Sequence, residues 1–292
     1  MKKKRLPISK TYKLYIGGQF PRTESGRTLK VVDLKGNLFA HLCYGSRKDF
    51  RNAVVCARQA QGSWSARSAY NRGQILYRMA EMLEGKREEF VGALMQTCPG
   101  GRRRAVKEVD AAIDCLINFA GWSDKYSQIV GCNNPVSGPY YNFTIPEPVG
   151  VVGIIAPNEE PLLSLVAMLA PVIVSGNTVV ILGSQQYPIC TSLFAEVCAT
   201  SDVPAGVINL LTSKRDELIK YYADHRDLNA VLAAGCSPEE RVILERGSSV
   251  NLKRVRISML NSKDWYDKDL IESPYRIERF VEMKTIWHPV GG

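Results

Sequence analysis

The chain has 292 residues, 45% of them hydrophobic, and a formal net charge of +9, values that suit a globular protein of one large domain or two small ones. Its eight cysteines form no CxxC pair and its three histidines lie far apart in the sequence, so no structural metal site is expected. The basic residues are dispersed and no aromatic-basic motif accompanies them, which argues against nucleic-acid binding.

The amino terminus is basic. MKKKR is followed by Pro7, Ser9, Lys10 and Lys13 where a secretory signal needs an apolar core, and we expect residues 1–13 to form a tail or linker. A chain with no secretory signal and with scattered cysteines suits a reducing compartment. The sequence therefore predicts a cytoplasmic protein.

The first half of the chain predicts helices after a short strand pair. Leu14–Phe20 and Thr28–Val32 form the predicted pair. Apolar residues then recur at every third or fourth position, which predicts helices over residues 49–61, 69–84, 88–96 and 108–120. Residues 121–139 are rich in loop-forming residues, and Tyr140–Ile145 is a separate predicted strand that stops at Pro146.

From Val149 onward, apolar and β-branched runs predict further strands, and the uncharged run at residues 149–156 is typical of a strand that is buried on both faces. These strands cover residues 149–156, 178–182, 206–211, 230–233 and 252–259. The helices predicted between them cover residues 162–174, 192–200, 216–225 and 238–246. This alternation is typical of right-handed β-α-β units, so the predicted fold class is α/β with a doubly wound five-stranded parallel sheet. The uncharged run Leu162–Val174 is shorter than the roughly 18 residues of a membrane span, and no membrane association is expected.

Doubly wound sheets bind ligands beyond the carboxyl ends of their strands, often with a phosphate at a helix amino terminus. The candidate helix start here is Ser237-Pro238-Glu239-Glu240. Ser237 and Glu240 form a capping box that satisfies the helix's own amide donors, and Glu239 adds a second negative charge. This pattern argues against tight binding of a diphosphate.

Several segments carry a family resemblance. EPVGVVGIIAP, GNTVVIL with the later Pro188, and VPAGVINLLT, together with YIGGQF and DLNAVLAAG, resemble the cofactor-domain signature of the aldehyde dehydrogenase superfamily over about residues 14–262. The resemblance implies a cofactor-binding-type domain formed by residues 14–138 and 147–262, and oligomerisation strands at residues 139–146 and 276–290. It also implies that the family's catalytic domain is absent.

Members of this family oxidise aldehydes with a cysteine nucleophile, an oxyanion-binding asparagine, a glutamate base and NAD(P). The resemblance places Glu159 at the asparagine position, with Asn158 as a realigned alternative, and Ser258 at the glutamate position. No cysteine follows Cys236. The sequence therefore predicts no catalytic residue, since loss of a nucleophile alone costs on the order of 10⁶ in turnover.

The family's cofactor site is also altered in this chain. The lysine that holds the cofactor's ribose falls at Leu182, and its charge-assisted hydrogen bond is lost. The remaining family positions at this site are Ile155, Pro157, Ser184, Gly206, Gly235 and Cys236. We expect no bound cofactor, and residual binding of NAD(P) is the alternative.

The end of the chain resembles the family's last oligomerisation strand. Apolar and polar residues alternate over residues 279–287, as in a strand with one apolar face. Such an edge needs cover, which a second subunit would give; alternatively, Glu282 and Lys284 protect it. The predicted assembly residues are Tyr141, Phe143, Phe280, Val281, Met283, Thr285 and Trp287.

This organisation resembles the shortened, degenerate second copy found in aldehyde dehydrogenase family 16 proteins. The leading prediction is a non-catalytic domain that serves in dimer or inter-domain assembly, with a second copy of this chain or a complete aldehyde dehydrogenase copy as partner. The alternative is an oxidoreductase of the aldehyde dehydrogenase type, or a residual NAD(P) binder, that acts with a complete copy.

Overall fold

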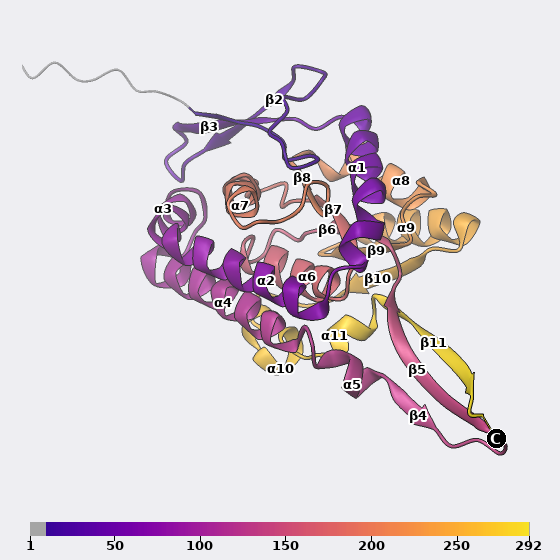
Figure 1. Ribbon diagram of the computed structural model, residues 1–292. Coiled ribbons are helices and arrows are strands. Elements are labelled where there is room, and N and C mark those ends of the chain that lie inside the picture. Colours follow the sequence, from indigo (N-terminus) through magenta and orange to yellow (C-terminus); the bar gives the residue numbers. More distant parts are fainter. Residues whose placement is uncertain (1–9, 292) are drawn as a thin grey trace, which may run out of the picture.

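A five-stranded parallel sheet forms the centre of the computed structural model, which describes residues 10–291 (Figure 1). The strands lie in the order β10-β9-β6-β7-β8. Their bounds are β6 (Val151–Ile155), β7 (Thr178–Leu182), β8 (Ile208–Leu211), β9 (Ala230–Ala234) and β10 (Arg254–Ser258). Each of the five overlaps a predicted strand, so the predicted α/β fold with a five-stranded parallel sheet is confirmed.

Helices cover both faces of this sheet, as the doubly wound prediction requires. Apolar residues of α1 (Arg47–Ser65), α8 (Arg215–Asp224) and α9 (Pro238–Asn251) pack on one face. On the other face α6 (Leu163–Val174) and α7 (Ile189–Ala199) form the first layer. A further helical layer covers that face, made of α2 (Ala69–Gly85), α3 (Arg87–Thr97) and α4 (Gly101–Trp122).

Helix α6 lies between two layers, which explains its composition. Every residue from Leu163 to Val174 is buried, because the sheet covers one side of the helix and α2 and α4 cover the other. Pro171 lies inside this helix without ending it. The uncharged run is therefore a core helix. None of the helices between residues 10 and 291 combines the length and apolarity needed to cross a bilayer.

The amino-terminal part forms a small sheet instead of the predicted strand pair. Its strands are β1 (Thr11–Tyr12), β2 (Thr28–Val32) and β3 (Leu38–Cys43), in the order β1-β3-β2. The prediction of a strand over Leu14–Phe20 was wrong, because Gly17 and Gly18 take positive φ and fold the segment into a tight turn. Of the tail predicted over residues 1–13, residues 1–9 lie outside the described part of the chain. The prediction was wrong for Thr11 and Tyr12, because they pair with β3 as strand β1.

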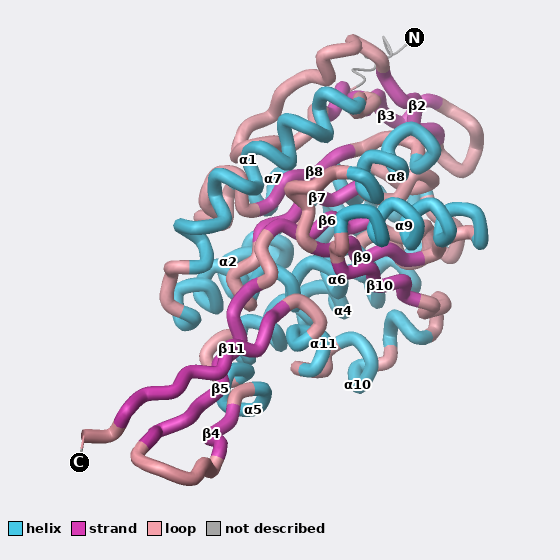
Figure 2. Tube along the Cα trace, turned by 90° about the vertical axis from the view of Figure 1, so that its right-hand side faces the viewer, coloured by secondary structure: helices cyan, strands magenta, loops and turns pink. Residues whose placement is uncertain are grey.

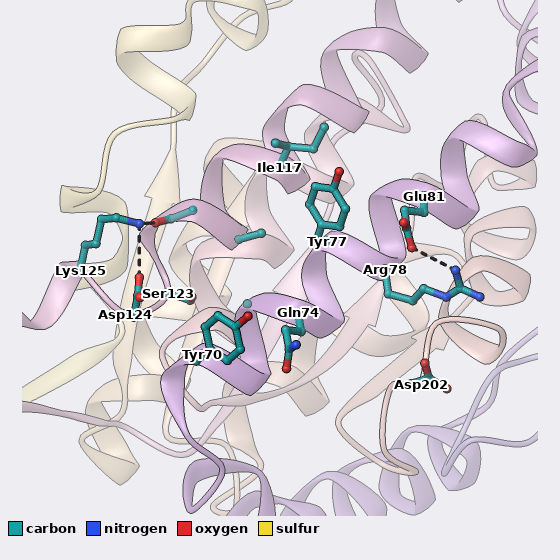
Figure 3. A pocket seen from close by; sticks show the side chains of 13 residues that line it. Tyr70, Gln74, Tyr77, Arg78, Glu81, Ile117, Ser123, Asp124, Lys125 and Asp202 are labelled. Atoms are coloured by element: carbon teal, nitrogen blue, oxygen red, sulfur yellow. Dashed lines mark hydrogen bonds and ion pairs between the residues drawn. The ribbon is translucent and has the colours of Figure 1, made fainter.

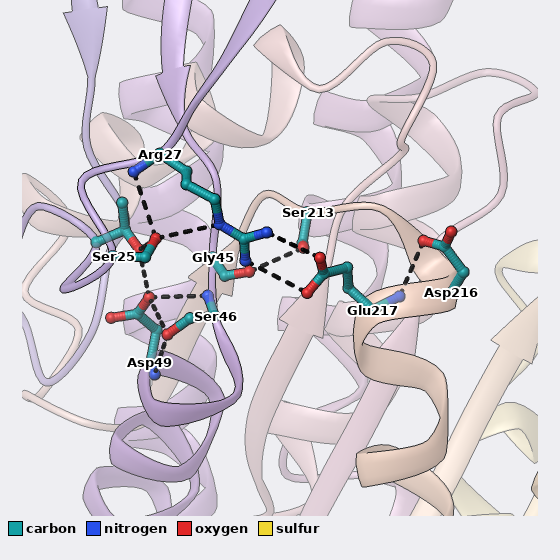
Figure 4. A network of polar contacts seen from close by, with 9 residues as sticks. Ser25, Arg27, Gly45, Ser46, Asp49, Ser213, Asp216 and Glu217 are labelled. Carbon is teal, nitrogen blue, oxygen red and sulfur yellow. Dashed lines mark hydrogen bonds and ion pairs between the residues drawn. The ribbon is translucent and has the colours of Figure 1, made fainter.

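The start of α1 is tied to the small sheet and to α8 (Figure 4). Ser46 and Asp49 form a capping box at the helix start, and Thr23 donates a hydrogen bond of 2.6 Å to the Asp49 carboxylate. Arg27, just before β2, makes an ion pair of 2.9 Å with Glu217 in the first turn of α8. These contacts fix α1 and α8 against the same face of the central sheet.

A three-stranded arm projects from the body (Figure 2). It is defined by β4 (Cys132–Asn134), β5 (Tyr140–Pro148) and β11 (Val281–Pro289), in the order β11-β5-β4. The helix α5 (Tyr126–Val130) leads into it. The predicted strand was expected to stop at Pro146, but β5 continues past it. The proline is tolerated because β4 pairs only with residues 142–144, so no ladder bond on that side is lost.

Residues 259–280 connect the central sheet to the arm. They form a 3-10 turn at Asp264–Tyr266 and the short helices α10 (Lys268–Ile271) and α11 (Tyr275–Glu278). Trp265 and Phe280 are buried in the core. This segment takes the place between β10 and β11 where the family resemblance implies a whole catalytic domain.

Candidate functional site

The carboxyl edge of the central sheet gathers most of the predicted site residues. Parallel strands end at the same edge, so the residues that follow β6, β7 and β9 lie together. The loops after β6 and β9 are in contact, because a Cβ on Gly235 would lie 3.1 Å from the Cβ of Pro157. The predicted residues placed at this edge are Ile155, Pro157, Asn158, Glu159, Ser184, Gly235 and Cys236.

Gly206 does not belong to this group. It precedes β8, whose first residue is Ile208, and therefore lies at the amino edge of the sheet. Its φ is +86°, and a Cβ there would lie 2.5 Å from the backbone oxygen of Cys56 on α1. Close packing against α1 and a left-handed turn account for this glycine.

The predicted capping box at the start of α9 is present. Ser237 Oγ accepts a hydrogen bond of 3.2 Å from the backbone N–H of Glu240, and the Glu240 carboxylate accepts one of 3.0 Å from the backbone N–H of Ser237. The Ser237 hydroxyl also donates to Glu239, which lowers the pKa of that carboxyl. Protein carboxylates therefore occupy the helix end where an anionic ligand would be favoured.

A buried arginine that the sequence analysis missed lies at the centre of the edge. Arg215 is the first residue of α8 and is only 4% exposed. Its Nη2 donates to the carbonyl oxygens of Ala156 and Ala234, at 2.5 and 2.8 Å. Its Nη1 donates to the carbonyl oxygen of Gly235 at 2.7 Å and to Glu240 at 3.2 Å. One guanidinium thus joins the ends of β6 and β9 to the start of α9.

The loop after β7 is held by its own side chains. The Ser184 hydroxyl donates to Asn158 Oδ1 at 3.0 Å and accepts from the backbone N–H of Tyr187, also at 3.0 Å. Asn158 Oδ1 accepts a second bond, from the backbone N–H of Gln186. Leu182 is fully buried in the cluster that packs against α1 and α8. The hydrogen bond between Asn158 and Ser184 therefore connects the loops after β6 and β7.

The loop after β6 carries a second unpredicted cluster. Glu159 is exposed, whereas Glu160 is buried with a φ of +45°. Glu160 makes an ion pair of 3.1 Å with Arg104 on α4 and accepts a hydrogen bond of 2.6 Å from the Tyr266 hydroxyl. The loop that would hold the family's oxyanion donor is thereby tied to α4 and to the segment that precedes the arm.

Glu108 completes this cluster from inside α4. It is fully buried, and its Oε1 accepts a hydrogen bond of 2.8 Å from the backbone N–H of Leu162 at the start of α6. Burial and the nearby charge of Glu160 raise the pKa of Glu108 to about 8. Its position on the apolar face of α4, between Ala105 and Ala112, is the sequence signal that could have found it.

A groove of about 540 Å³ adjoins this cluster. It is lined by basic and polar side chains from the start of α4 and from the segment after β10. Lys107 lies over the ring of Tyr266, with its Nζ 3.9 Å from the ring centroid. The Arg104 charge that faces the groove is already paired with Glu160. We assign no ligand to this groove.

Ser258, which the family resemblance places at the position of the glutamate base, has no carboxyl group. Ser258 is the last residue of β10 and pairs with Ala234. A surface pocket of about 540 Å³ lies beside it, with Arg256, Tyr275 and Arg279 among its lining residues. Ser258 carries no carboxyl that could accept a proton, so no general base stands at this position.

The cysteine nearest the edge is a poor nucleophile. Burial raises the pKa of the Cys236 thiol, and it raises the pKa of Cys98 to about 11. A thiol with a raised pKa is neutral at physiological pH and reacts slowly. In the part of the chain that the structure describes, no three side chains of His, Cys, Asp or Glu are grouped so as to bind a metal ion.

Another surface groove lies away from this edge (Figure 3). It has a volume of about 700 Å³ and lies between α2 and α4, with Tyr70, Tyr77 and Ile117 among its lining residues. Four of the charged side chains around it are paired locally, Arg78 with Glu81 and Lys125 with Asp124. We assign no reaction to this groove.

The predicted assembly residues fall into three groups. Met283, Thr285 and Trp287 share one face of the arm, since all three alternate along β11 and Thr285 pairs with Thr144. Tyr141 and Phe143 lie on the opposite face, with their ring centroids 5.3 Å apart. Phe280 and Val281 are buried at the base of the arm, where they anchor it to the body.

Comparison with known proteins places these features in context. The model of the aldehyde dehydrogenase family matches residues 22–261. A mitochondrial benzaldehyde dehydrogenase from Antirrhinum majus is 30% identical over 260 residues, which are 87% of this chain and 48% of that protein. A mitochondrial aldehyde dehydrogenase from Homo sapiens is 30% identical over 253 residues, covering 84% of this chain and 48% of that protein. The chain thus spans about half the length of these relatives.

The fold of this chain also matches solved structures of aldehyde dehydrogenases over about half of their length. An aldehyde dehydrogenase structure from Burkholderia cenocepacia, described as putative, matches with a TM-score of 0.81 at 28% identity and covers 85% of this chain and 50% of that chain. An NAD⁺ complex of an aldehyde dehydrogenase from Bacillus cereus matches with a TM-score of 0.80 at 26% identity and the same coverage of each chain.

Proposed function

This chain belongs to the aldehyde dehydrogenase family, and from that premise we propose that it is a non-catalytic member whose role is assembly. In this proposal the arm pairs with a second copy of the chain, to give a dimer, or with a complete dehydrogenase copy. The observation that carries the proposal is the projecting arm, which is partly apolar and has an open strand edge. The body that bears it has Glu159 and Ser258 at the positions where the family's oxyanion donor and base are expected.

The replaced chemistry supports the non-catalytic part. Glu159 stands where the oxyanion donor is expected and Ser258 where the base is expected, while Asn158 is engaged with Ser184 and Gln186. Cys236 has a raised pKa, and no cysteine follows it in the sequence. A nucleophile, an oxyanion donor and a base must all be in place for the family reaction.

The open edge of the arm supports the assembly part. β11 is paired only with β5, so the hydrogen-bonding groups along its outer edge face away from the sheet. Lys284 pairs with Glu147 of β5 at 2.8 Å, and Glu282 pairs with Arg254 of β10 at 3.3 Å. The two charges that could have protected the edge are therefore partly neutralised within the chain. This lowers the electrostatic cost of pairing β11 with a partner strand.

The exposed side chains of the arm add to this argument. Trp287 is 58% exposed, and Tyr140, Tyr141 and Met283 are exposed as well. Aromatic residues and methionine are enriched at protein interfaces, and an edge strand with such neighbours is suited to pairing with another strand. The arm thus offers both backbone and side-chain groups to a partner.

We also infer that the chain corresponds to the shortened second copy of aldehyde dehydrogenase family 16 proteins. Its support is that residues 259–280 alone connect β10 to β11, and that the matched region is about half of each relative. We place the protein in the cytoplasm, because all eight of its cysteines are free thiols, as suits a reducing compartment.

Sedimentation velocity of the purified chain at tens of micromolar tests the assembly role. We expect a dimer, or a complex when a complete dehydrogenase copy is added. A chain that sediments as a monomer under these conditions and forms no complex with a complete copy would refute the proposal.

The second candidate is an oxidoreductase, or a residual binder of NAD(P), that acts with a complete copy. It is favoured by the parallel sheet and by the family's cofactor-domain segments, which this chain retains. Calorimetric titration with NAD and NADP separates the two candidates. A low-micromolar dissociation constant supports the second candidate, whereas millimolar or undetectable binding rejects it.

A further inference from the structure

The strand order of the central sheet defines a topological switch point between β6 and β9 at its carboxyl edge. β6 and β9 are neighbours, but the chain leaves their carboxyl ends in opposite directions. β6 continues through α6 on one face of the sheet to β7, and β9 continues through α9 on the other face to β10. Such a switch point leaves a crevice between the two strand ends, and this crevice is where doubly wound sheets bind nucleotides.

Arg215 fills this crevice. Its guanidinium donates to the carbonyl oxygen of Ala156, just after β6, and to those of Ala234 and Gly235 at the end of β9. These acceptors belong to the two strands that define the switch point. A planar guanidinium has five N–H donors in a fixed geometry, which suits several convergent oxygen atoms.

Glu240 closes the same arrangement from α9. Its Oε2 accepts from the backbone N–H of Ser237 and lies 3.2 Å from Arg215 Nη1. The helix start that faces a phosphate in nucleotide-binding sheets here faces a carboxylate, and the charge of that carboxylate is compensated by Arg215. The charge of Glu240 is thus paired within the crevice, and both Nη atoms of Arg215 donate to groups of the chain, while its buried Nε has no partner.

We propose that Arg215 acts as an internal ligand of the switch point, so that its guanidinium, and not a dinucleotide, holds the ends of β6 and β9 to α9. A dinucleotide entering here must break four hydrogen bonds of a buried cation and must place its phosphates beside Glu239 and Glu240. The residues present therefore do not fit the cofactor that the family implies. The inference concerns the sheet edge, so it stands or falls independently of the role of the arm in assembly.

Removal of the guanidinium gives the first test. Arg215→Ala leaves Glu240 and three carbonyl oxygens without their partner, and we expect the midpoint of thermal unfolding to fall by roughly 10 °C. Guanidinium chloride at low millimolar concentration should restore part of this loss, because the free cation can occupy the vacated space. Sodium chloride at equal ionic strength should not. An unchanged midpoint, or equal effects of the two salts, would contradict the proposal.

Two further variants provide controls. Arg241→Ala removes an exposed arginine that pairs with Glu245 on the same helix, and it should show neither the loss nor the rescue. Arg215→Lys keeps the charge but cannot reach all four acceptors, so its midpoint should lie between those of Arg215→Ala and the unmodified chain. This variant gives the answer if Arg215→Ala does not fold. A lysine variant as stable as the unmodified chain would count against a role that needs the guanidinium.

Titration with NAD and NADP tests whether Arg215 replaces a nucleotide or binds one. The unmodified chain should give no binding heat with NAD or NADP up to about 1 mM. Micromolar binding by the unmodified chain that weakens in Arg215→Lys would overturn the proposal, since the arginine would then hold a nucleotide instead of replacing one. The oligomeric state, measured separately by sedimentation, should be the same in all these variants.

Discussion

Trp287 of β11 meets Tyr140 of β5 edge to face, with the ring centroids 5.8 Å apart and an interplanar angle of 77°. Both rings lie near the tip of the arm and are largely exposed, Trp287 at 58% and Tyr140 at 46%. Edge-to-face pairs of this kind are favourable by about 0.5–1.5 kcal/mol beyond the area they bury. An exposed aromatic pair beside an open strand edge is well suited to act as the anchor of an interface.

The first prediction concerns this pair. Trp287→Ala should raise the dissociation constant of the assembled form at least tenfold, because truncation of a central aromatic anchor costs about 2 kcal/mol or more. Sedimentation velocity across a concentration series measures the effect. Tyr70→Ala, which removes an equally exposed aromatic on α2, should leave the assembly unchanged. Equal effects of the two substitutions would show that Trp287 is not part of an interface.

The second prediction concerns the base of the arm. Asn177 is fully buried; its Oδ1 accepts from the backbone N–H of Gly150, and its Nδ2 donates to the carbonyl oxygens of Phe280 and Val172. Asn177→Ala leaves the buried N–H of Gly150 without its acceptor and removes one donor each from the carbonyls of Phe280 and Val172, so the free energy of unfolding should fall by about 3 kcal/mol. Urea denaturation measures it.

A matched control for this variant is Asn37→Ala, in the exposed turn between β2 and β3. This change should cost less than about 1 kcal/mol. Because Phe280 anchors β11, limited proteolysis should also cut the arm of Asn177→Ala faster than that of the control. If the arm of Asn177→Ala is cut no faster, the bond to Phe280 does not hold it in place.

The third prediction is a pH dependence from Glu108. Burial and the charge of Glu160 raise its pKa to about 8 in the folded chain, against an ordinary value of 4.5. Between these values the folded state binds the proton and the unfolded state does not. The contribution of Glu108 to stability is therefore complete below pH 4.5 and declines as the pH rises to about 8.

Glu108→Gln tests this dependence. Glutamine keeps an oxygen that can accept from Leu162 but carries no titrating charge, so the variant should be more stable than the unmodified chain at pH 8.5 and similar to it near pH 5. Thermal unfolding at a series of pH values measures the difference. Two parallel stability profiles would mean that Glu108 does not titrate in this range.

The fourth prediction concerns chemistry. The purified chain should produce no NADH from NAD and an aldehyde above the rate without protein, because in the proposed non-catalytic role Glu159 and Ser258 stand where the family's oxyanion donor and base are expected, and no cysteine follows Cys236. Absorbance at the NADH band measures it. Turnover by a homogeneous preparation that a single substitution, such as Cys236→Ala, abolishes would contradict the non-catalytic assignment. Turnover that the substitution leaves unchanged would indicate a contaminating enzyme.

Local sequence patterns were sufficient for the central sheet. Val179–Ile181 is apolar on both faces, as a covered parallel strand requires, and β7 has the predicted bounds. The small amino-terminal sheet was less predictable. β3 contains a histidine and lacks a continuous β-branched run, and the tight turn at Gly17 and Gly18 breaks the expected strand.

The candidate site could be predicted only in part, because its main interactions connect distant segments. The capping box of Ser237 and Glu240 is local, so the spacing revealed it. Arg215 lies just before the helix predicted over residues 216–225, and only the fold brings it to Ala156 and Gly235. Glu160 likewise finds Arg104 through tertiary structure. Ion pairs between distant segments leave no mark on the hydrophobic periodicity or on the local spacing of residues in the sequence.

The arm joins strands that are far apart in the sequence, and this determines when it can form. Thr144 on β5 and Thr285 on β11 lie 141 positions apart, yet their hydroxyls are hydrogen bonded. During synthesis β5 therefore leaves the ribosome roughly ten seconds or more before its partner strand. A nascent chain therefore cannot display a finished arm until β11 has been translated.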